Sequence, residues 1–161
     1  CLLTLRDEAL ALGLGAKAGT VAAHALLFEE FVAREAAAGR FAIDFAGAAA
    51  PILVHAHCHQ KAFAAAQPIV DVLALVPGAK PKLVETSCCG MAGTFGYEAK
   101  HRAVSLAMAE ASLLPAIRAE PAAIVVADGT SCRQQIAFGA GREALHAARV
   151  LERLLPQAAA R

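Results

Sequence analysis

The chain has 161 residues, of which 58% are hydrophobic, and its formal net charge at pH 7 is +1. This length fits one domain of ordinary size that buries its own core. A near-neutral chain with one tyrosine and no tryptophan lacks the basic patch and stacking surface typical of nucleic-acid binding, so we expect no such partner. Charged residues interrupt each apolar stretch before the ~18 residues of a membrane span, so we expect no span.

The five cysteines indicate a reducing environment. Their number is odd and their spacing is long and uneven, unlike the disulfide framework of a small secreted protein. We therefore expect free thiols and a cytoplasmic protein. The chain begins at Cys1 without a recognisable secretory leader, and we interpret it as a piece of a longer protein.

The first third of the chain is predicted to be helical. Residues 2–12 and 20–38 carry apolar side chains at helical spacing, and a glycine follows each segment. Phe41, Ile43 and Phe45 then alternate with other residues, which is the pattern of a short edge strand. The Ala- and Gly-rich sequence after them favours a connector instead.

Three short apolar runs follow, at residues 51–55, 81–85 and 123–127. Each has the length and β-branched content of a buried strand and precedes a helical pattern. The expected helices cover residues 62–75, residues 98–118 and a segment from 131 or 142 to 155. Strands that alternate with helices pair in parallel through right-handed crossovers. We therefore predict a three-layer α/β fold, in which helices flank a small, Rossmann-like parallel sheet of three to four strands.

Cysteines follow all three predicted strands. Cys58 comes after the first, the Cys88-Cys89 pair after the second and Cys132 after the third. Because open α/β folds bind ligands at the carboxyl edge of the sheet, we expect these four side chains to converge there. One cysteine after a strand is usually a small buried hydrophobe. Four at equivalent loops predict a site for zinc, copper(I) or an iron–sulfur cluster, the metals that thiolates select.

Histidines and glycines accompany these cysteines. His55, His57 and His59 surround Cys58, and each imidazole can be a metal ligand, a donor to a ligand sulfur or part of a polar rim. Gly90 follows the cysteine pair, where an uncovered amide group can donate to thiolate sulfur. The pair itself also permits thiol–disulfide chemistry, which requires a lowered thiol pKa.

Three motifs carry a resemblance to a known family. They are His57-Cys58-His59-Gln60-Lys61-Ala62, Thr86-Ser87-Cys88-Cys89-Gly90-Met91-Ala92-Gly93 and Asp128-Gly129-Thr130-Ser131-Cys132. In this order they resemble the cysteine-rich, or CCG, domain found in heterodisulfide reductase and in the iron–sulfur subunits of glycolate and glycerol-3-phosphate oxidases. The motifs are more similar still to the C-terminal region of fused bacterial proteins with FAD-binding and iron–sulfur-binding parts, of the D-lactate and D-2-hydroxyglutarate dehydrogenase type.

The resemblance implies an iron–sulfur electron-transfer domain of an FAD-linked oxidoreductase that acts on a 2-hydroxy acid: D-lactate, glycolate or D-2-hydroxyglutarate. Its partners would be the FAD-linked oxidase and ferredoxin-like domains of the parent protein. The FAD would then lie outside this chain, which alone would not be catalytic. The protein would be cytoplasmic or, through the parent enzyme, peripheral at the inner membrane.

The CCG unit usually occurs twice in this family. By that resemblance, residues 1–47 would be the helical tail of a first copy, and Cys1 would be the last cysteine of that copy. Residues 48–161 would be the second copy, a cysteine-rich α/β domain.

The chain departs from part of the family at Gln135. Members that assemble a non-cubane cluster end in Cys-x-x-Cys, and Gln135 stands in place of the second cysteine. The four strand-end cysteines remain, with Cys1 as a candidate fifth ligand. Four thiolates suffice for a [4Fe-4S] cluster or for tetrahedral zinc. We predict the cluster; the alternative is a zinc-binding structural or interaction domain without a redox role.

Overall fold

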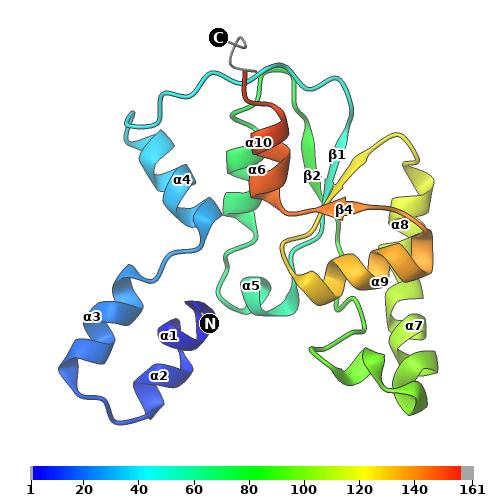
Figure 1. Ribbon diagram of the computed structural model, residues 1–161, viewed down its shortest axis with the longest axis horizontal. Helices are drawn as coiled ribbons and strands as arrows, with labels where there is room; N and C mark the ends of the chain where they lie inside the picture. The colour runs from blue at the N-terminus through cyan, green and yellow to red at the C-terminus, as the bar shows by residue number, and fades with distance from the viewer. Residues whose placement is uncertain (1, 157–161) are drawn as a thin grey trace, which may run out of the picture. The chain divides into compact units, whose positions relative to one another are not determined.

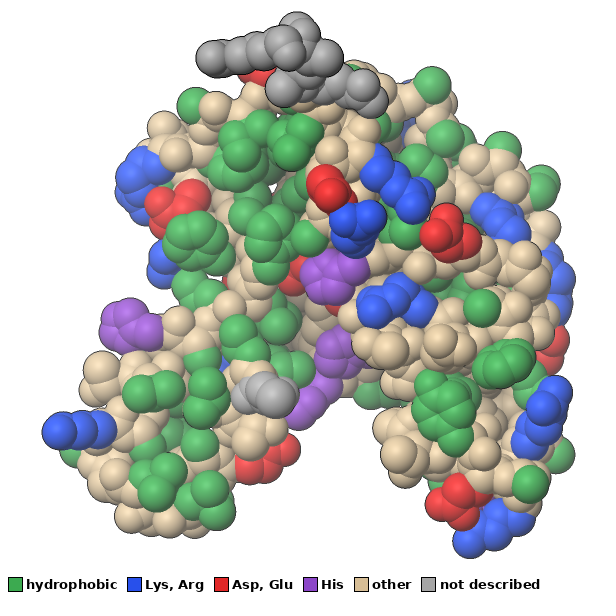
Figure 2. Space-filling view, viewed as in Figure 1, with side chains coloured by type: hydrophobic (Ala, Val, Ile, Leu, Met, Phe, Trp, Pro, Cys, Tyr) green, Lys and Arg blue, Asp and Glu red, His purple; other side chains and the backbone are tan. Residues whose placement is uncertain are grey.

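The structure is a computed structural model that describes residues 2–156. The chain divides into two compact units, residues 1–42 and residues 43–161 (Figure 1). None of the described helices is long and apolar enough to cross a membrane. On the face drawn in Figure 2, acidic and basic side chains are interspersed.

The first unit is helical. Its elements are α1 (Leu2–Arg6), α2 (Glu8–Ala11), α3 (Ala16–His24) and α4 (Phe28–Ala37). Both helices expected here are split, because the chain turns at Asp7 and again before Phe28. The Glu30 carboxylate accepts a hydrogen bond from the Leu27 amide at 2.8 Å and pairs with Arg6 at 2.7 Å, so it caps α4 and ties it to α1. Cys1 lies outside the described residues.

The second unit is built on a four-stranded sheet in the order β2-β1-β3-β4. The strands are β1 (Ile52–Val54), β2 (Pro81–Leu83), β3 (Ile124–Val126) and β4 (Ala144–Leu145). All three pairings are parallel, with Ile52 opposite both Pro81 and Ile124. The predicted α/β fold with a small parallel sheet is confirmed.

Helices flank the sheet (Figure 1). They are α5 (Cys58–Ala62), α6 (Gln67–Leu73), α7 (Arg102–Glu110), α8 (Leu113–Ala119), α9 (Thr130–Ala140) and α10 (Ala147–Arg153), with 3-10 turns η1 (Phe95–Tyr97) and η2 (Ala99–His101). Helices α7, α8 and α9 pack on one another, while α10 packs on α6. These contacts give the three layers that the sequence predicts.

The structure corrects three local expectations. Residues 41–49 form no strand, so the edge-strand prediction is wrong and the segment is a connector. The helix expected at 62–75 is interrupted at Ala64, whose φ is +54°. The helix expected at 98–118 begins with 3-10 turns and breaks at Ser112, because Pro115 cannot donate to the carbonyl of Ala111 and so cannot continue α7.

The strand order places a switch point between β1 and β3. From β1 the chain steps outward to β2, and it then crosses back past β1 to β3. At such a point the connections leave the sheet on opposite faces, which opens a crevice at the carboxyl ends of the strands. Cys58, at the start of α5, follows β1, and Cys132, in the first turn of α9, follows β3.

Candidate metal centre

All four cysteines of the predicted site line one pocket at the carboxyl edge of the sheet. Its volume is about 260 Å³, and the residues around it come from the segments that follow β1, β2 and β3. They are His57, Cys58, His59, Cys88, Cys89, Ala92, Gly93, Gly129, Ser131 and Cys132. At ~30 Å³ per water molecule, the pocket has room for a group larger than a single ion.

The four thiols are free and differ in burial. Cys58, the first residue of α5, is exposed, and Cys88, in the loop after β2, is half-buried. Cys89 and Cys132 are only 4% and 3% exposed. They pack in the same hydrophobic cluster as Leu113 of α8, so the core of the domain forms one wall of the site.

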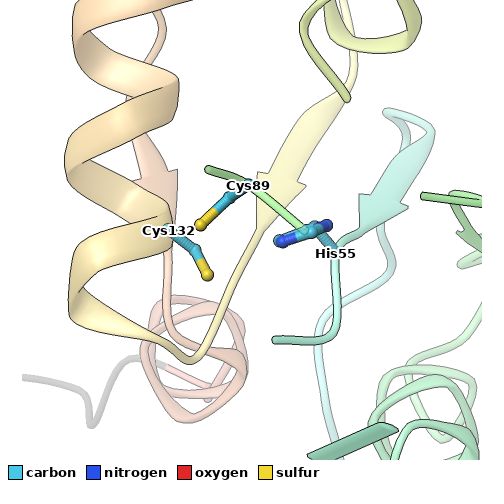
Figure 3. Close-up of side chains that lie close together, drawn as sticks. All are labelled: His55, Cys89 and Cys132. Atoms are coloured by element: carbon cyan, nitrogen blue, oxygen red, sulfur yellow. The ribbon is translucent and has the colours of Figure 1, made fainter. Parts of the chain in front are cut away.

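His55 joins the two buried cysteines. One ring nitrogen of His55 and the sulfurs of Cys89 and Cys132 lie within 4.8 Å of one another. Figure 3 shows a ring nitrogen of His55 facing the two sulfurs. Cys58 and Cys88 line the same pocket but are not part of this close group. The structure therefore brings one of the three predicted histidines into the sulfur cluster.

The pKa values of the two buried cysteines are shifted in opposite directions. The S–H of Cys132 donates to Cys89, which holds the pKa of Cys89 well below the usual range of a thiol against the opposing effect of burial. His55 and the backbone amide of Met91 lower that pKa further. The same contact, together with burial, raises the pKa of Cys132. Cys89 is thus ready as a thiolate, the form of cysteine that binds metal.

The exposed side of the pocket is arranged differently. Burial, followed by the neighbouring thiol of Cys88, raises the pKa of Cys58. The Cys88 sulfur accepts a hydrogen bond from the Gly90 amide at 3.3 Å. His57 is the N-cap of α5, and burial lowers the pKa of its imidazole. His57 and His59 line the pocket beside these thiols.

The Cys88-Cys89-Gly90 turn requires its glycine. Gly90 has φ +87°, and a Cβ at that position would lie 2.0 Å from the carbonyl oxygen of Ser105. Gln135 holds Ser105 in place, because its Nε2 donates to the Ser105 carbonyl and hydroxyl oxygens, both at 3.0 Å. Gln135 therefore braces the turn from α9 and does not line the cysteine pocket.

A polar frame that the sequence did not reveal as functional holds the loops together. Lys61 donates to Thr86 and Ser87, and so joins α5 to the loop after β2. Gln60 donates to the Asp128 carboxylate at 2.8 Å, which joins α5 to the loop after β3. The only signal in the sequence is that these polar residues stand inside the cysteine motifs.

Comparison with known proteins finds similarity over parts of the chain. A stretch of 59 residues, 37% of this chain, is 46% identical to D-2-hydroxyglutarate dehydrogenase of Escherichia coli (strain K12). A stretch of 104 residues, 65% of this chain, is 27% identical to one of the subunits of anaerobic glycerol-3-phosphate dehydrogenase of the same organism. The D-2-hydroxyglutarate dehydrogenase of Pantoea ananatis (strain AJ13355) is 35% identical over 78 residues, 48% of this chain.

These matches span little of the relatives' own length. The aligned segments are 6% and 8% of the two D-2-hydroxyglutarate dehydrogenases and 26% of the glycerol-3-phosphate dehydrogenase polypeptide. No family model and no solved structure matches the chain. The chain is thus similar to segments of larger dehydrogenases, and its cysteine and histidine groups can bind a metal.

Proposed function

We propose that the second unit binds a [4Fe-4S] cluster through Cys58, Cys88, Cys89 and Cys132 and carries electrons within a larger oxidoreductase. One observation carries the proposal: four cysteine side chains from the segments that follow three separate strands line a single pocket. Four thiolates are the usual ligand set of such a cluster.

The pocket fits such a group in shape and in chemistry. Gly129 forms part of its wall, and a Cβ there would lie 3.0 Å from the Cys132 sulfur and 3.2 Å from His57, so glycine keeps this space open. The Gly90 amide already donates to the Cys88 sulfur. Amide donors of this kind stabilise the negative charge on ligand sulfurs.

The cysteines would hold the cluster from two sides of the pocket, the core side and the solvent side. Cys89 offers a thiolate on the core side, where the packed hydrophobic cluster excludes water. Cys58 and Cys88 close the site on the solvent side. When bound, the cluster supplies a centre that takes up and releases one electron at a time.

The resemblance, together with the partial similarities, supports a parent activity. We infer an FAD-linked oxidoreductase that oxidises a 2-hydroxy acid: D-lactate, glycolate or D-2-hydroxyglutarate. In this arrangement, another part of the parent protein, next to a ferredoxin-like domain, would hold the FAD, which would supply the hydride chemistry. The present chain then carries electrons in the cytoplasm or at the inner membrane surface.

Zinc is the second candidate, and the buried group favours it. His55, Cys89 and Cys132 are within 4.8 Å of one another. Sulfur ligands ~2.3 Å from a tetrahedral zinc ion lie roughly 3.8 Å apart, so this group is near the size of a single-ion site. Zinc is redox-silent, and the domain would then be structural.

Metal analysis of the full chain, purified and reconstituted without oxygen, separates the two candidates. We expect a brown protein with about four iron and four sulfide per chain and a reversible one-electron signal in voltammetry. A colourless protein that binds one zinc tightly and gives no redox signal would contradict the cluster.

A further inference from the structure

The two ring nitrogens of His55 lie in different environments. His55 directly follows β1, is 1% exposed, and its backbone amide donates to the Val126 carbonyl at 2.8 Å. Its Nδ1 lies 2.9 Å from the Thr86 hydroxyl oxygen. Its Nε2 is buried and has no hydrogen-bond partner among residues 2–156. This nitrogen is therefore the one left to face the sulfurs of Cys89 and Cys132 (Figure 3).

The proton on the ring decides what His55 does there. A neutral imidazole carries one proton, so one nitrogen donates and the other offers a lone pair. With the proton on Nδ1, Nε2 would be a metal ligand. With the proton on Nε2, the ring would direct an N–H group at the sulfurs, and the hydrogen bond made by the other nitrogen sets this choice.

Lys61 sets the direction of the hydrogen bond at Nδ1. Its ammonium group has three N–H donors and three acceptors: the Thr86 carbonyl at 2.6 Å, the Ser87 carbonyl at 2.7 Å and the Thr86 hydroxyl at 3.1 Å. An ammonium group cannot accept, so the Thr86 hydroxyl accepts from Lys61 and must send its own proton elsewhere. Within the described part of the chain, the other partner of that hydroxyl is His55 Nδ1.

We propose that Lys61 and Thr86 fix His55 in the Nε2–H tautomer, so that His55 is an N–H donor to the sulfurs of Cys89 and Cys132 and not a metal ligand. The inference rests on the proposed function, in which these sulfurs bind the cluster. An N–H group directed at a ligand sulfur stabilises the extra negative charge of the reduced state and so raises the reduction potential.

The tautomer is measured in the metal-free full chain, with ¹⁵N-labelled histidine and long-range ¹H–¹⁵N correlation spectra at a pH where the ring is neutral. We expect the Nε2–H pattern for His55. We expect Thr86→Ser to keep it, and Thr86→Val, which removes the hydroxyl and preserves the shape, to reduce it. The Nδ1–H pattern in the native chain, or no response to Thr86→Val, would overturn the proposal.

The reconstituted chain gives a second, independent readout. His55→Gln keeps an N–H donor and His55→Leu does not. We expect both variants to keep the native iron content, His55→Leu to shift the midpoint potential downward, and His55→Gln to restore part of that shift. Loss of iron in His55→Leu would show a ligand and contradict the donor role. If the native chain binds no iron, the proposed function fails, while the tautomer spectra still decide the state of His55.

Discussion

The two sides of the cysteine pocket differ in burial and in the pKa values of their thiols. Cys89 and Cys132 are embedded in the core, one close to a thiolate and the other its donor, with His55 beside them. Cys58 and Cys88 lie at the solvent side, where partial desolvation of the Cys58 sulfur and the neighbouring Cys88 thiol raise the pKa of Cys58. Under the proposed function, packing would therefore fix the position of the buried pair before metal binds, whereas the exposed pair would adjust on binding.

Replacing a cysteine on each side of the pocket by serine tests this difference, and it is expected to give the largest effect, a loss of bound iron. Serine is nearly isosteric with cysteine but offers a hard oxygen in place of the soft sulfur that these metals select. We expect Cys132→Ser to lower the iron content of the reconstituted chain from about four per chain to near zero. Cys58→Ser, the matched variant on the exposed side, should lose only part of its iron, because solvent can supply a replacement ligand there.

Iron and sulfide assays after anaerobic reconstitution give the comparison, and far-ultraviolet circular dichroism of the metal-free variants checks that both are folded. Equal loss of iron in the two variants would remove the distinction between a preformed and an adjustable side.

Sequence patterns predicted that the four cysteines converge, because the main determinant of their convergence is the topology of the sheet. Three β-branched runs, each followed by a cysteine, are enough to place Cys58, Cys89 and Cys132 at one edge of a parallel sheet. β4 was not predicted as a strand, because a strand of two residues, Ala144 and Leu145, is too short to show an apolar or alternating pattern.

The polar frame was beyond prediction for another reason. Lys61 and Thr86 are 25 residues apart, and their contact depends on how β1 and β2 pair. The His55–Thr86 contact depends on the same pairing. This contact distinguishes His55 from the other two histidines near Cys58. A sequence shows which residues have hydrogen-bonding groups, but only tertiary structure shows which donor meets which acceptor.

Two glycines of the loop after β2, Gly90 and Gly93, compare the buried and exposed sides of the pocket at the level of the backbone. Gly90 lies against Ser105 on the buried side, where an added Cβ would lie 2.0 Å from the Ser105 carbonyl oxygen. Gly93 has φ +66°, and an added Cβ there would have nothing within 4 Å. Alanine at Gly93 costs only the left-handed conformation, about 1 kcal/mol. Alanine at Gly90 adds a clash with backbone, so we expect a loss of roughly 3 kcal/mol in the free energy of unfolding.

Urea denaturation of the metal-free full chain, followed by circular dichroism, measures both glycine variants. Similar midpoints for Gly90→Ala and Gly93→Ala would mean that α7 shifts to admit the methyl group, and the buried side would then be less rigid than its packing implies.

The smallest expected effect is a pH dependence on the exposed side, through His57. Its Nδ1 accepts a hydrogen bond from the Gln60 amide at 3.4 Å, and burial lowers its pKa below the ~6.5 of an unfolded chain. The unfolded state therefore binds more protons at mildly acidic pH, so this contribution to stability is present above about pH 6.5 and is lost as the pH falls through the folded pKa. We expect the metal-free chain to lose at most ~1 kcal/mol from this group, the range of an N-cap interaction.

The matched variant for this effect is His57→Asn, which keeps an N-cap acceptor that does not titrate. Its unfolding free energy should change less between about pH 7.5 and about pH 5.5 than that of the native chain, because only the native chain has an imidazole at this position, and that imidazole binds a proton more readily in the unfolded state. Identical pH dependence in urea denaturation of the two chains would contradict the prediction and show that protonation of the His57 cap does not affect the stability of the domain.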